Sequence, residues 1–162
     1  MSAASIPAMS IHEHVESRVY LYPGGLWAEA APGVITTVLG SCVSVCLWDP
    51  HAALGGINHF ILPHGGSARS PRYGNHSLVM LLERVLSLGA HREQLLAAVF
   101  GGASVLALES ADLPRLGGRN VAEALEFLQR AGIPIVRQDV GGRTGRKLTF
   151  RSADGTTLVR KL

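Results

Sequence analysis

Apolar residues in the first sixty positions fall in short runs that glycine and proline interrupt. Runs of this length that are rich in β-branched residues are typical of strands, and Gly and Pro mark the turns between them. The first half of the chain is therefore expected to be rich in β-structure. The predicted strands are Val19–Trp27, broken at Pro23-Gly24-Gly25, then Val34–Leu39, Val43–Trp48 and Ile57–Leu62.

Apolar spacing becomes helical after a polar loop at residues 65–74. Asn75 or Ser77 is suited to the N-cap of this first helix, and Gly89 is suited to the position just past its end. The apolar face consists of Leu78, Leu81, Leu82, Val85 and Leu86.

A second helix is predicted to open near Gly117 and to stop at Gly132. Asn120 precedes Glu123 by three residues, which is close to the spacing of a capping box. The apolar face consists of Val121, Ala124, Leu125 and Leu128.

Four further strand segments complete the pattern, and the last two form a hairpin around Asp154-Gly155. Many strands with two helices, and neither an internal repeat nor a linker, predict a single α+β domain. We expect residues 1–17 to form a flexible leader and residues 18–162 to form the domain. The strand segments are Leu95–Phe100, Ile133–Val136, and Leu148–Phe150 with Thr157–Val159.

Composition excludes several classes of protein. The 162 residues are 47% hydrophobic and 17% charged, which argues against intrinsic disorder. The net charge of +3 is carried by scattered basic residues, so a nucleic-acid-binding module ranks last. One concentration of basic residues is expected to be solvated surface, with attraction of an acidic protein partner as the weaker alternative. It consists of Arg137, Arg143, Arg146, Lys147 and Arg151.

The sequence contains neither a secretory signal pattern nor an apolar stretch long enough for membrane insertion. A cytoplasmic location is therefore expected, and thiols stay reduced there. Two cysteines, Cys42 and Cys46, are too few for a disulfide framework or for a zinc site made of cysteine alone.

The two cysteines differ in their surroundings. Cys46 lies within an apolar strand and is expected to pack in the core. Cys42 follows Gly40-Ser41 at a strand break, where a sharp turn leaves backbone N–H groups near the thiol as a candidate oxyanion hole. For Cys42 the residues alone leave a core role and a nucleophilic role about equally favoured.

His59 is the candidate base, because a polar residue in an apolar strand must be hydrogen-bonded or functional. The turn between the strands can bring it beside Cys42, and the hydroxyl of Thr36 or Thr37 can orient it. A satisfied core histidine remains the alternative, and His64 is the competing base. The His12/His14 pair lacks further ligands for a metal site.

A glycine-rich turn, Gly101-Gly102-Ala103-Ser104, follows a predicted strand but lacks the lysine and the spacing of a P-loop. A backbone role near the active site is therefore a better interpretation of this turn than phosphate binding.

The blocks from Thr36 to Pro50 and from Gly55 to Pro63 form a recognisable pattern. They resemble the CheD family of chemoreceptor glutamine deamidases, and later segments agree with them. The later segments are Phe100-Gly101-Gly102-Ala103, Gly118-Arg119-Asn120-Val121 and Asp139-Val140-Gly141-Gly142. The resemblance extends over about residues 18–162.

The resemblance implies a central β-sandwich of mixed sheets flanked by helices, and a Cys–His–Thr triad. The family cysteine falls on Cys42 and the histidine on His59, while counting back from the cysteine favours Thr36 over Thr37. Backbone amides around Ser41 and Val43 are the expected oxyanion donors.

The implied reaction converts glutamines of methyl-accepting chemotaxis receptors to glutamates, with no metal and no organic cofactor. A CheC-type phosphatase is an implied partner. Two alternatives remain: a non-catalytic chemotaxis adaptor that binds receptors or that phosphatase, and a thiol acyl transferase that would share the thioester intermediate.

Overall fold

The computed structural model describes residues 4–5, 15–104 and 115–162. These residues contain nine strands, two α-helices and one short 3-10 helix. The strands are β1 (Ser17–Tyr20), β2 (Leu26–Ala28), β3 (Gly33–Leu39), β4 (Val43–Asp49), β5 (Leu54–Asn58), β6 (Leu96–Gly101), β7 (Ile135–Val140), β8 (Arg146–Arg151) and β9 (Thr157–Lys161). The helices are α1 (Gly74–Ser87), η1 (Arg92–Gln94) and α2 (Leu116–Ala131).

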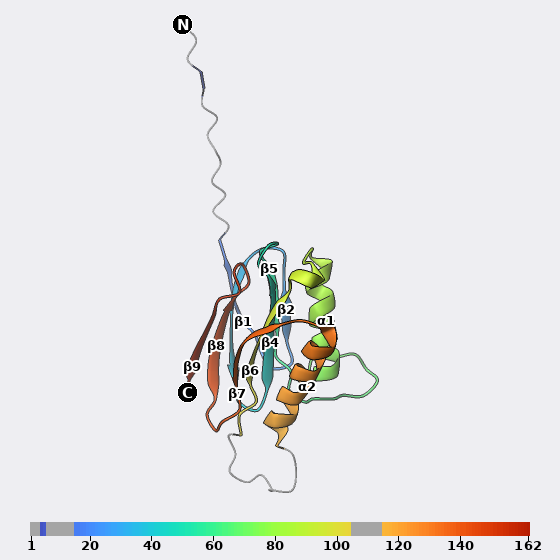
Figure 1. Ribbon diagram of the computed structural model, residues 1–162. Helices are drawn as coiled ribbons and strands as arrows, with labels where there is room; N and C mark the ends of the chain where they lie inside the picture. The colour runs from blue at the N-terminus through green and yellow to red at the C-terminus, as the bar shows by residue number, and fades with distance from the viewer. Residues whose placement is uncertain (1–3, 6–14, 105–114) are drawn as a thin grey trace.

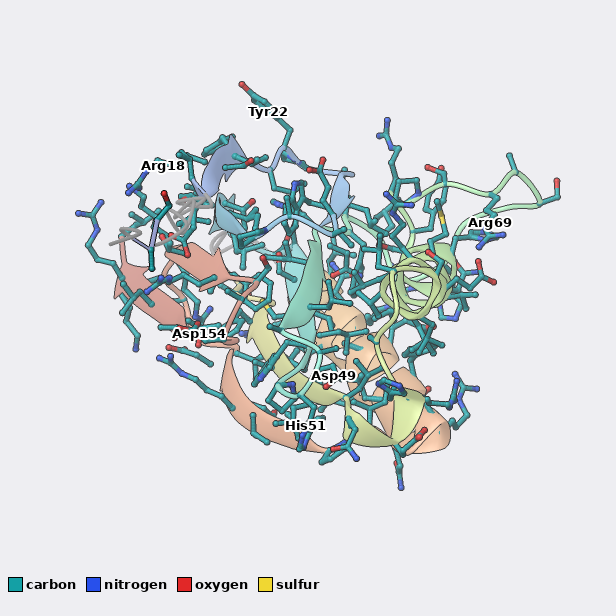
Figure 2. The ribbon with its side chains drawn as sticks, turned by 90° about the horizontal axis from the view of Figure 1, so that it is seen from above. Arg18, Tyr22, Asp49, His51, Arg69 and Asp154 are labelled. Atoms are coloured by element: carbon teal, nitrogen blue, oxygen red, sulfur yellow. The ribbon has the colours of Figure 1, made fainter. Side chains whose placement is uncertain are left out.

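The strands form two mixed sheets that pack face to face, and both α-helices cover the outer face of one of them (Figure 1). The four-stranded sheet has the order β1-β3-β8-β9, and the five-stranded sheet has the order β2-β5-β4-β6-β7. Seen from above, the layers succeed one another as sheet, sheet and helices, with Arg18 on the outer side of the four-stranded sheet (Figure 2). This confirms the α+β sandwich, with helices on one side only.

Alternation along the strands divides the interior into two cores. In β3, Ile35, Thr37 and Leu39 are buried between the sheets, whereas Val38 faces solvent. β4 is buried along its whole length, because one face meets the other sheet and the opposite face meets the helices. The intersheet core contains Ile35, Leu39, Cys46, Trp48, Ile57, Ala98, Phe100, Leu148 and Phe150.

The helices begin differently from the sequence-based expectation. α1 starts at Gly74 with Tyr73 at the N-cap and no side-chain cap, so neither Asn75 nor Ser77 caps it. Instead Asn75 Oδ1 accepts the Gly65 N–H at 3.1 Å. The prediction that Gly89 follows the end of α1 is confirmed, since the C-cap is Leu88.

α2 begins at Leu116, one turn earlier than a cap at Asn120 requires. The predicted capping box is therefore wrong, because Asn120 lies in the second turn and its side chain binds two carbonyl oxygens of other segments. Gly132, in the left-handed conformation, is the C-cap as predicted. The hairpin at Asp154-Gly155 is also confirmed, since it joins β8 to β9.

Arg146, at the start of β8, joins the two sheets beside the glycine-rich turn by hydrogen bonds to β7 and to that turn. Its guanidinium donates to Asp139 Oδ1 at 2.9 Å and to the carbonyl oxygens of Gly141 and Gly101 at 2.8 and 3.4 Å. Only 3% of Arg146 is exposed, so it is not part of the solvated basic surface expected from the sequence. The buried charge is fully paired, as burial requires.

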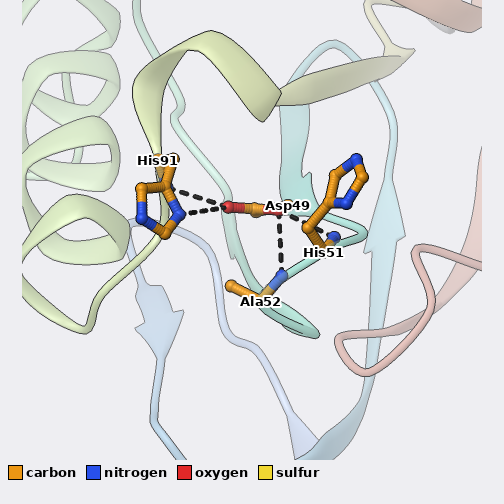
Figure 3. A network of polar contacts seen from close by, with 4 residues as sticks. All are labelled: Asp49, His51, Ala52 and His91. Atoms are coloured by element: carbon orange, nitrogen blue, oxygen red, sulfur yellow. Dashed lines mark hydrogen bonds and ion pairs between the residues drawn. The ribbon is translucent and has the colours of Figure 1, made fainter.

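A second buried charge closes the turn after β4 (Figure 3). Both carboxylate oxygens of Asp49 accept hydrogen bonds: Oδ1 from the backbone N–H groups of His51 and Ala52, and Oδ2 from that of His91. These bonds lower the pKa of Asp49 against the opposing effect of its desolvation. The predicted leader, residues 1–17, lies largely outside the described residues, although Ser17 already belongs to β1.

The close approach of Gly101 to the Cys42 carbonyl oxygen leads to a prediction about stability. This residue has φ +106°, and an added Cβ would lie 2.2 Å from the Cys42 carbonyl oxygen. Gly142, at φ +74°, has open space around it. We expect Gly101→Ala to lower the free energy of unfolding by about 2 kcal/mol more than Gly142→Ala, because only the former adds a steric clash to the backbone strain.

Urea unfolding of both variants measures this difference. Equal losses of unfolding free energy would contradict the close approach.

Candidate active site

Cys42 lies at the turn where the chain leaves the four-stranded sheet and enters the five-stranded one. Gly40 and Ser41 separate it from the end of β3, and β4 begins at the next residue. The Gly102 N–H donates to the Cys42 carbonyl at 2.9 Å, and the Ala103 N–H donates to the Gly40 carbonyl at 2.9 Å. The glycine-rich turn thus fixes the backbone of the cysteine turn, as the sequence indicated.

The two cysteines lie on one face of the same extended segment but differ in exposure. Cys46 is fully buried in the intersheet core, which raises the pKa of its thiol well above the usual value. Cys42 is half-buried and packs at the edge of that core. Both thiols are free of disulfides. These positions agree with a packing role for Cys46 and leave Cys42 as the accessible thiol.

His59 follows β5 and is held against β4 by the strand register. Val43 opposes Phe60, and Cys46 opposes Ile57, so His59 lies opposite Ser44 on the face that also carries Cys42. Cys42 directly precedes Val43, the last residue of this pairing, so it lies at the end of the ladder beside the segment that carries His59. The backbone of His59 is fixed on its other side by bonds to Gly24 N and Gly25 O at 2.8 and 3.0 Å.

A chain of two hydrogen bonds determines which ring nitrogen of His59 carries a proton. The Thr37 hydroxyl donates to the Leu21 carbonyl oxygen at 2.7 Å and lies 2.7 Å from His59 Nδ1. A hydroxyl has a single proton, so Thr37 must accept from Nδ1–H. Nε2 is then the unprotonated nitrogen, and it is buried with no partner among the described residues.

The structure places Thr37, not Thr36, against His59. The Thr36 side chain faces the opposite side of β3, where its hydroxyl lies 3.3 Å from that of Thr149. The preference for Thr36, drawn from counting back along the sequence, is therefore corrected to Thr37. The alternation of β3 carried the signal, since Thr37 shares the inward face with Ile35 and Leu39.

Burial keeps both members of the Cys42–His59 pair neutral at rest. Desolvation lowers the pKa of His59 from 6.5 to about 4. Desolvation also raises the pKa of the Cys42 thiol, and the Cys42 backbone N–H opposes this rise only in part. Neutral imidazole is the form that accepts a proton, so the pair suits proton transfer during attack rather than a preformed ion pair.

The expected oxyanion donors differ in availability. The Val43 N–H donates to the Phe60 carbonyl at 3.2 Å, so it is already used and the expectation for Val43 is corrected. Among residues 15–104 and 115–162, the backbone N–H groups of Ser41 and Cys42 donate to no acceptor, although the Cys42 N–H lies close to its own thiol. Ser41 and Cys42 are therefore the donors that the turn leaves available.

The competing groups lie elsewhere or are paired. His64 Nε2 is 3.2 Å from Glu123 Oε2, and two thirds of the His64 side chain is exposed, so it does not compete with His59 as a buried base. His12 and His14 lie outside the described residues. The described part of the chain contains no cluster of His, Cys, Asp and Glu that could hold a metal ion.

Sequence reasoning missed two groups at this site. The Leu21 carbonyl oxygen, which determines the tautomer of His59, carries no signal in its side chain. Asn120 was attributed to a helix cap, but its Nδ2 donates to the Ser41 and Ile61 carbonyl oxygens, both at 2.9 Å.

Comparison with known proteins identifies the family of this chain. The family model described as CheD chemotactic sensory transduction matches residues 61–161, more than half of the chain. The chain belongs to the CheD family. The matched segment begins two residues after His59, so it includes neither His59 nor Cys42.

CheD relatives align with most of the chain. A protein of Trichlorobacter lovleyi named probable chemoreceptor glutamine deamidase CheD is 44% identical over 144 residues, 88% of this chain and 89% of its own length. The similarly named CheD 1 of Anaeromyxobacter dehalogenans is 49% identical over 148 residues, 90% of this chain and 85% of its own. The Rhodospirillum rubrum protein of that name is 45% identical over 144 residues, 88% and 81% of the two chains.

Among solved structures, the hypothetical protein YfiH of Bacillus licheniformis aligns with 65% of this chain and 46% of its own, at 17% identity and a TM-score of 0.40. This distant likeness adds nothing to the CheD assignment. In the described part of the chain, no helix combines the length and the apolar character needed to span a membrane.

The neutral state of His59 leads to a prediction about how the unfolding free energy depends on pH. Because its pKa is about 4 in the folded protein and 6.5 ordinarily, the unfolded chain binds the proton first as the pH falls. His59 should therefore remove about 3 kcal/mol of unfolding free energy between pH 6.5 and pH 4.

Urea unfolding at several pH values, with His59→Gln as the reference, isolates this contribution from those of the other histidines. Parallel pH profiles for the two proteins would show that His59 is not kept neutral by the fold.

Proposed function

We propose that this protein is a protein-glutamine deamidase that converts glutamines of chemoreceptors to glutamates. The observation that carries the proposal is the state of His59, whose Nδ1 is bound to Thr37 and whose buried Nε2 has no partner among the described residues. It lies on the same face as the half-buried thiol of Cys42. The names of the relatives supply the substrate class.

The first half of the reaction follows from the proton positions. His59 Nε2 takes the proton of the Cys42 thiol while the sulfur attacks the carboxamide carbon of the substrate glutamine. The N–H groups of Ser41 and Cys42 stabilise the oxyanion. The imidazolium then gives its proton to the departing nitrogen, and ammonia leaves behind a thioester.

Hydrolysis of the thioester completes the cycle. His59 Nε2 takes a proton from water, whose oxygen attacks the thioester carbon, and the same proton returns to the sulfur as the C–S bond breaks. The balance is one amide and one water converted to one carboxylic acid and one ammonia. Thr37 holds Nδ1–H throughout, so the ring neither flips nor changes tautomer.

The setting and the partners belong to the same proposal. A reaction that uses a single reduced thiol suits the cytoplasm, where chemoreceptors expose their signalling segments. The resemblance to the family favours a CheC-type phosphatase as a controlling partner. A non-catalytic adaptor is the second candidate, and the intact arrangement of Cys42, His59 and Thr37 argues against it.

The nucleophile assignment predicts a difference between the two cysteines. Cys42→Ala should reduce ammonia release from a purified chemoreceptor fragment by more than ~10³-fold, because no other group can form the thioester. Cys46→Ala should keep most of the activity, because Cys46 only packs in the intersheet core.

Mass spectrometry of the receptor fragment identifies the product. Deamidation adds about one dalton per site, whereas acyl transfer adds the mass of the amine less that of the ammonia released. Receptor binding without ammonia release in the unmodified protein would favour the adaptor. Equal activity in Cys42→Ala would exclude Cys42 as nucleophile.

The threonine assignment predicts a contrast between neighbouring residues. Thr37→Val removes the hydroxyl that orients His59 and should lower kcat by about 10- to 100-fold, the loss seen when the hydrogen-bond partner of a histidine is removed at metal sites. Thr36→Val removes only the contact with Thr149 and should leave kcat within about twofold. Steady-state ammonia release measures both, and the opposite order would restore Thr36 to the site.

A further inference from the structure

The antiparallel pairing of β4 with the segment after β5 ends abruptly beside Cys42. Val43 and Phe60 exchange two backbone hydrogen bonds, at 3.2 and 3.0 Å. Such pairs recur at every second position of an antiparallel ladder, so the next one would join Ser41 to Leu62. That pair does not form: the Leu62 N–H donates to Arg72 O at 3.3 Å, and Leu62 O accepts the Gly74 N–H at 2.8 Å.

The side chain of Asn120 occupies the place where the ladder opens. Its Nδ2 donates to the carbonyl oxygen of Ser41, on the cysteine side, and to that of Ile61, two residues beyond His59, both at 2.9 Å. Both partners are carbonyl oxygens, so only the amide nitrogen can face them and the orientation of the side chain is unambiguous. One amide from α2 therefore spans the two segments that carry the candidate nucleophile and base.

The remainder of the Asn120 side chain points to a role other than stability. The residue is completely buried, and its Oδ1 has no hydrogen-bond partner among the described residues. A buried polar atom without a partner costs free energy, so a residue chosen for packing alone would not be an asparagine here. The cost is understandable when the two N–H groups fix something that the backbone cannot fix by itself.

We propose that Asn120 is a positioning residue for the deamidation reaction. It keeps the Ser41 carbonyl away from the Leu62 N–H, so that the ladder stays open and the Ser41 and Cys42 N–H groups remain available to the oxyanion. It also fixes the spacing between Cys42 and His59. This inference rests on the proposed function and adds to it a residue that touches neither the substrate nor the reacting atoms.

The test compares Asn120→Asp with Asn75→Asp. The first variant has nearly the same shape but no N–H to donate, so both carbonyl contacts are lost. The second makes the same chemical change at a half-buried site, where the Asn75 side chain serves, among the described residues, only as acceptor for Gly65 N–H and an aspartate can do the same. Asn120→Ala, which adds no charge, is the second variant at the site.

We expect Asn120→Asp and Asn120→Ala to lower kcat for ammonia release by about 10- to 100-fold, with KM changed less than about threefold, because a displaced oxyanion donor or nucleophile affects the transition state more than binding. Asn75→Asp should match the unmodified protein. A folded variant at position 120 with unchanged kcat would overturn the proposal. So would the failure of both variants to fold, because Asn120 would then be a determinant of folding instead.

Alkylation of Cys42 by iodoacetamide, measured in a Cys46→Ala background at pH 7 to 8, separates this proposal from the proposed function. If Asn120 sets the spacing between Cys42 and His59, Asn120→Ala should slow alkylation towards the rate of His59→Gln. Slower alkylation in Asn120→Ala, in a protein that deamidates no receptor, would refute the proposed function and support the positioning role. Receptor deamidation with unmodified kcat and alkylation rates in the position 120 variants would refute the positioning role alone.

Discussion

The hydroxyl of Thr37 has one proton, and it donates this proton in a hydrogen bond to the Leu21 carbonyl oxygen. From this follows the tautomer of His59, the unprotonated state of Nε2 and the direction in which a proton can move at the site. The three groups come from three different segments: the loop after β1, the centre of β3 and the residue after β5. The interaction exists only because two sheets pack face to face, so the chemistry depends on the tertiary fold and not on any one strand.

The same burial that orders the histidine also determines its charge. A polar chain in an apolar layer is stable only when each member has a partner or stays neutral, and the intersheet core around His59 is apolar. Removal of water lowers the pKa of His59 and raises that of Cys42, so neither is ionised before substrate arrives. The oxyanion donors are then the groups that must supply electrostatic stabilisation, which is why the open end of the ladder matters.

Much of this arrangement was readable from the sequence. The strand runs, the two helices and the hairpin follow from periodicity and turn residues, whereas the choice of Cys42 and His59 as site candidates also needed the resemblance to the family. The choice of Thr36 failed because it used a count along the chain, although alternation in β3 already separates the two threonines by face. The expectation that the Val43 N–H is an oxyanion donor failed for a different reason. Its hydrogen bond to the Phe60 carbonyl becomes visible only when the strands are paired.

Asn120 shows where sequence reasoning stops: its partners lie 79 and 59 residues away, and nothing local marks them.

The protonated state of the Cys42 thiol has a consequence for the life of the protein between turnovers. Peroxides and disulfides react with thiolates, and a thiol whose pKa is raised offers few of them. A nucleophile that stays protonated until His59 takes its proton is thereby less open to oxidation. Burial at this site therefore keeps the sulfur reduced and reactive under conditions in which a permanently ionised cysteine would be oxidised.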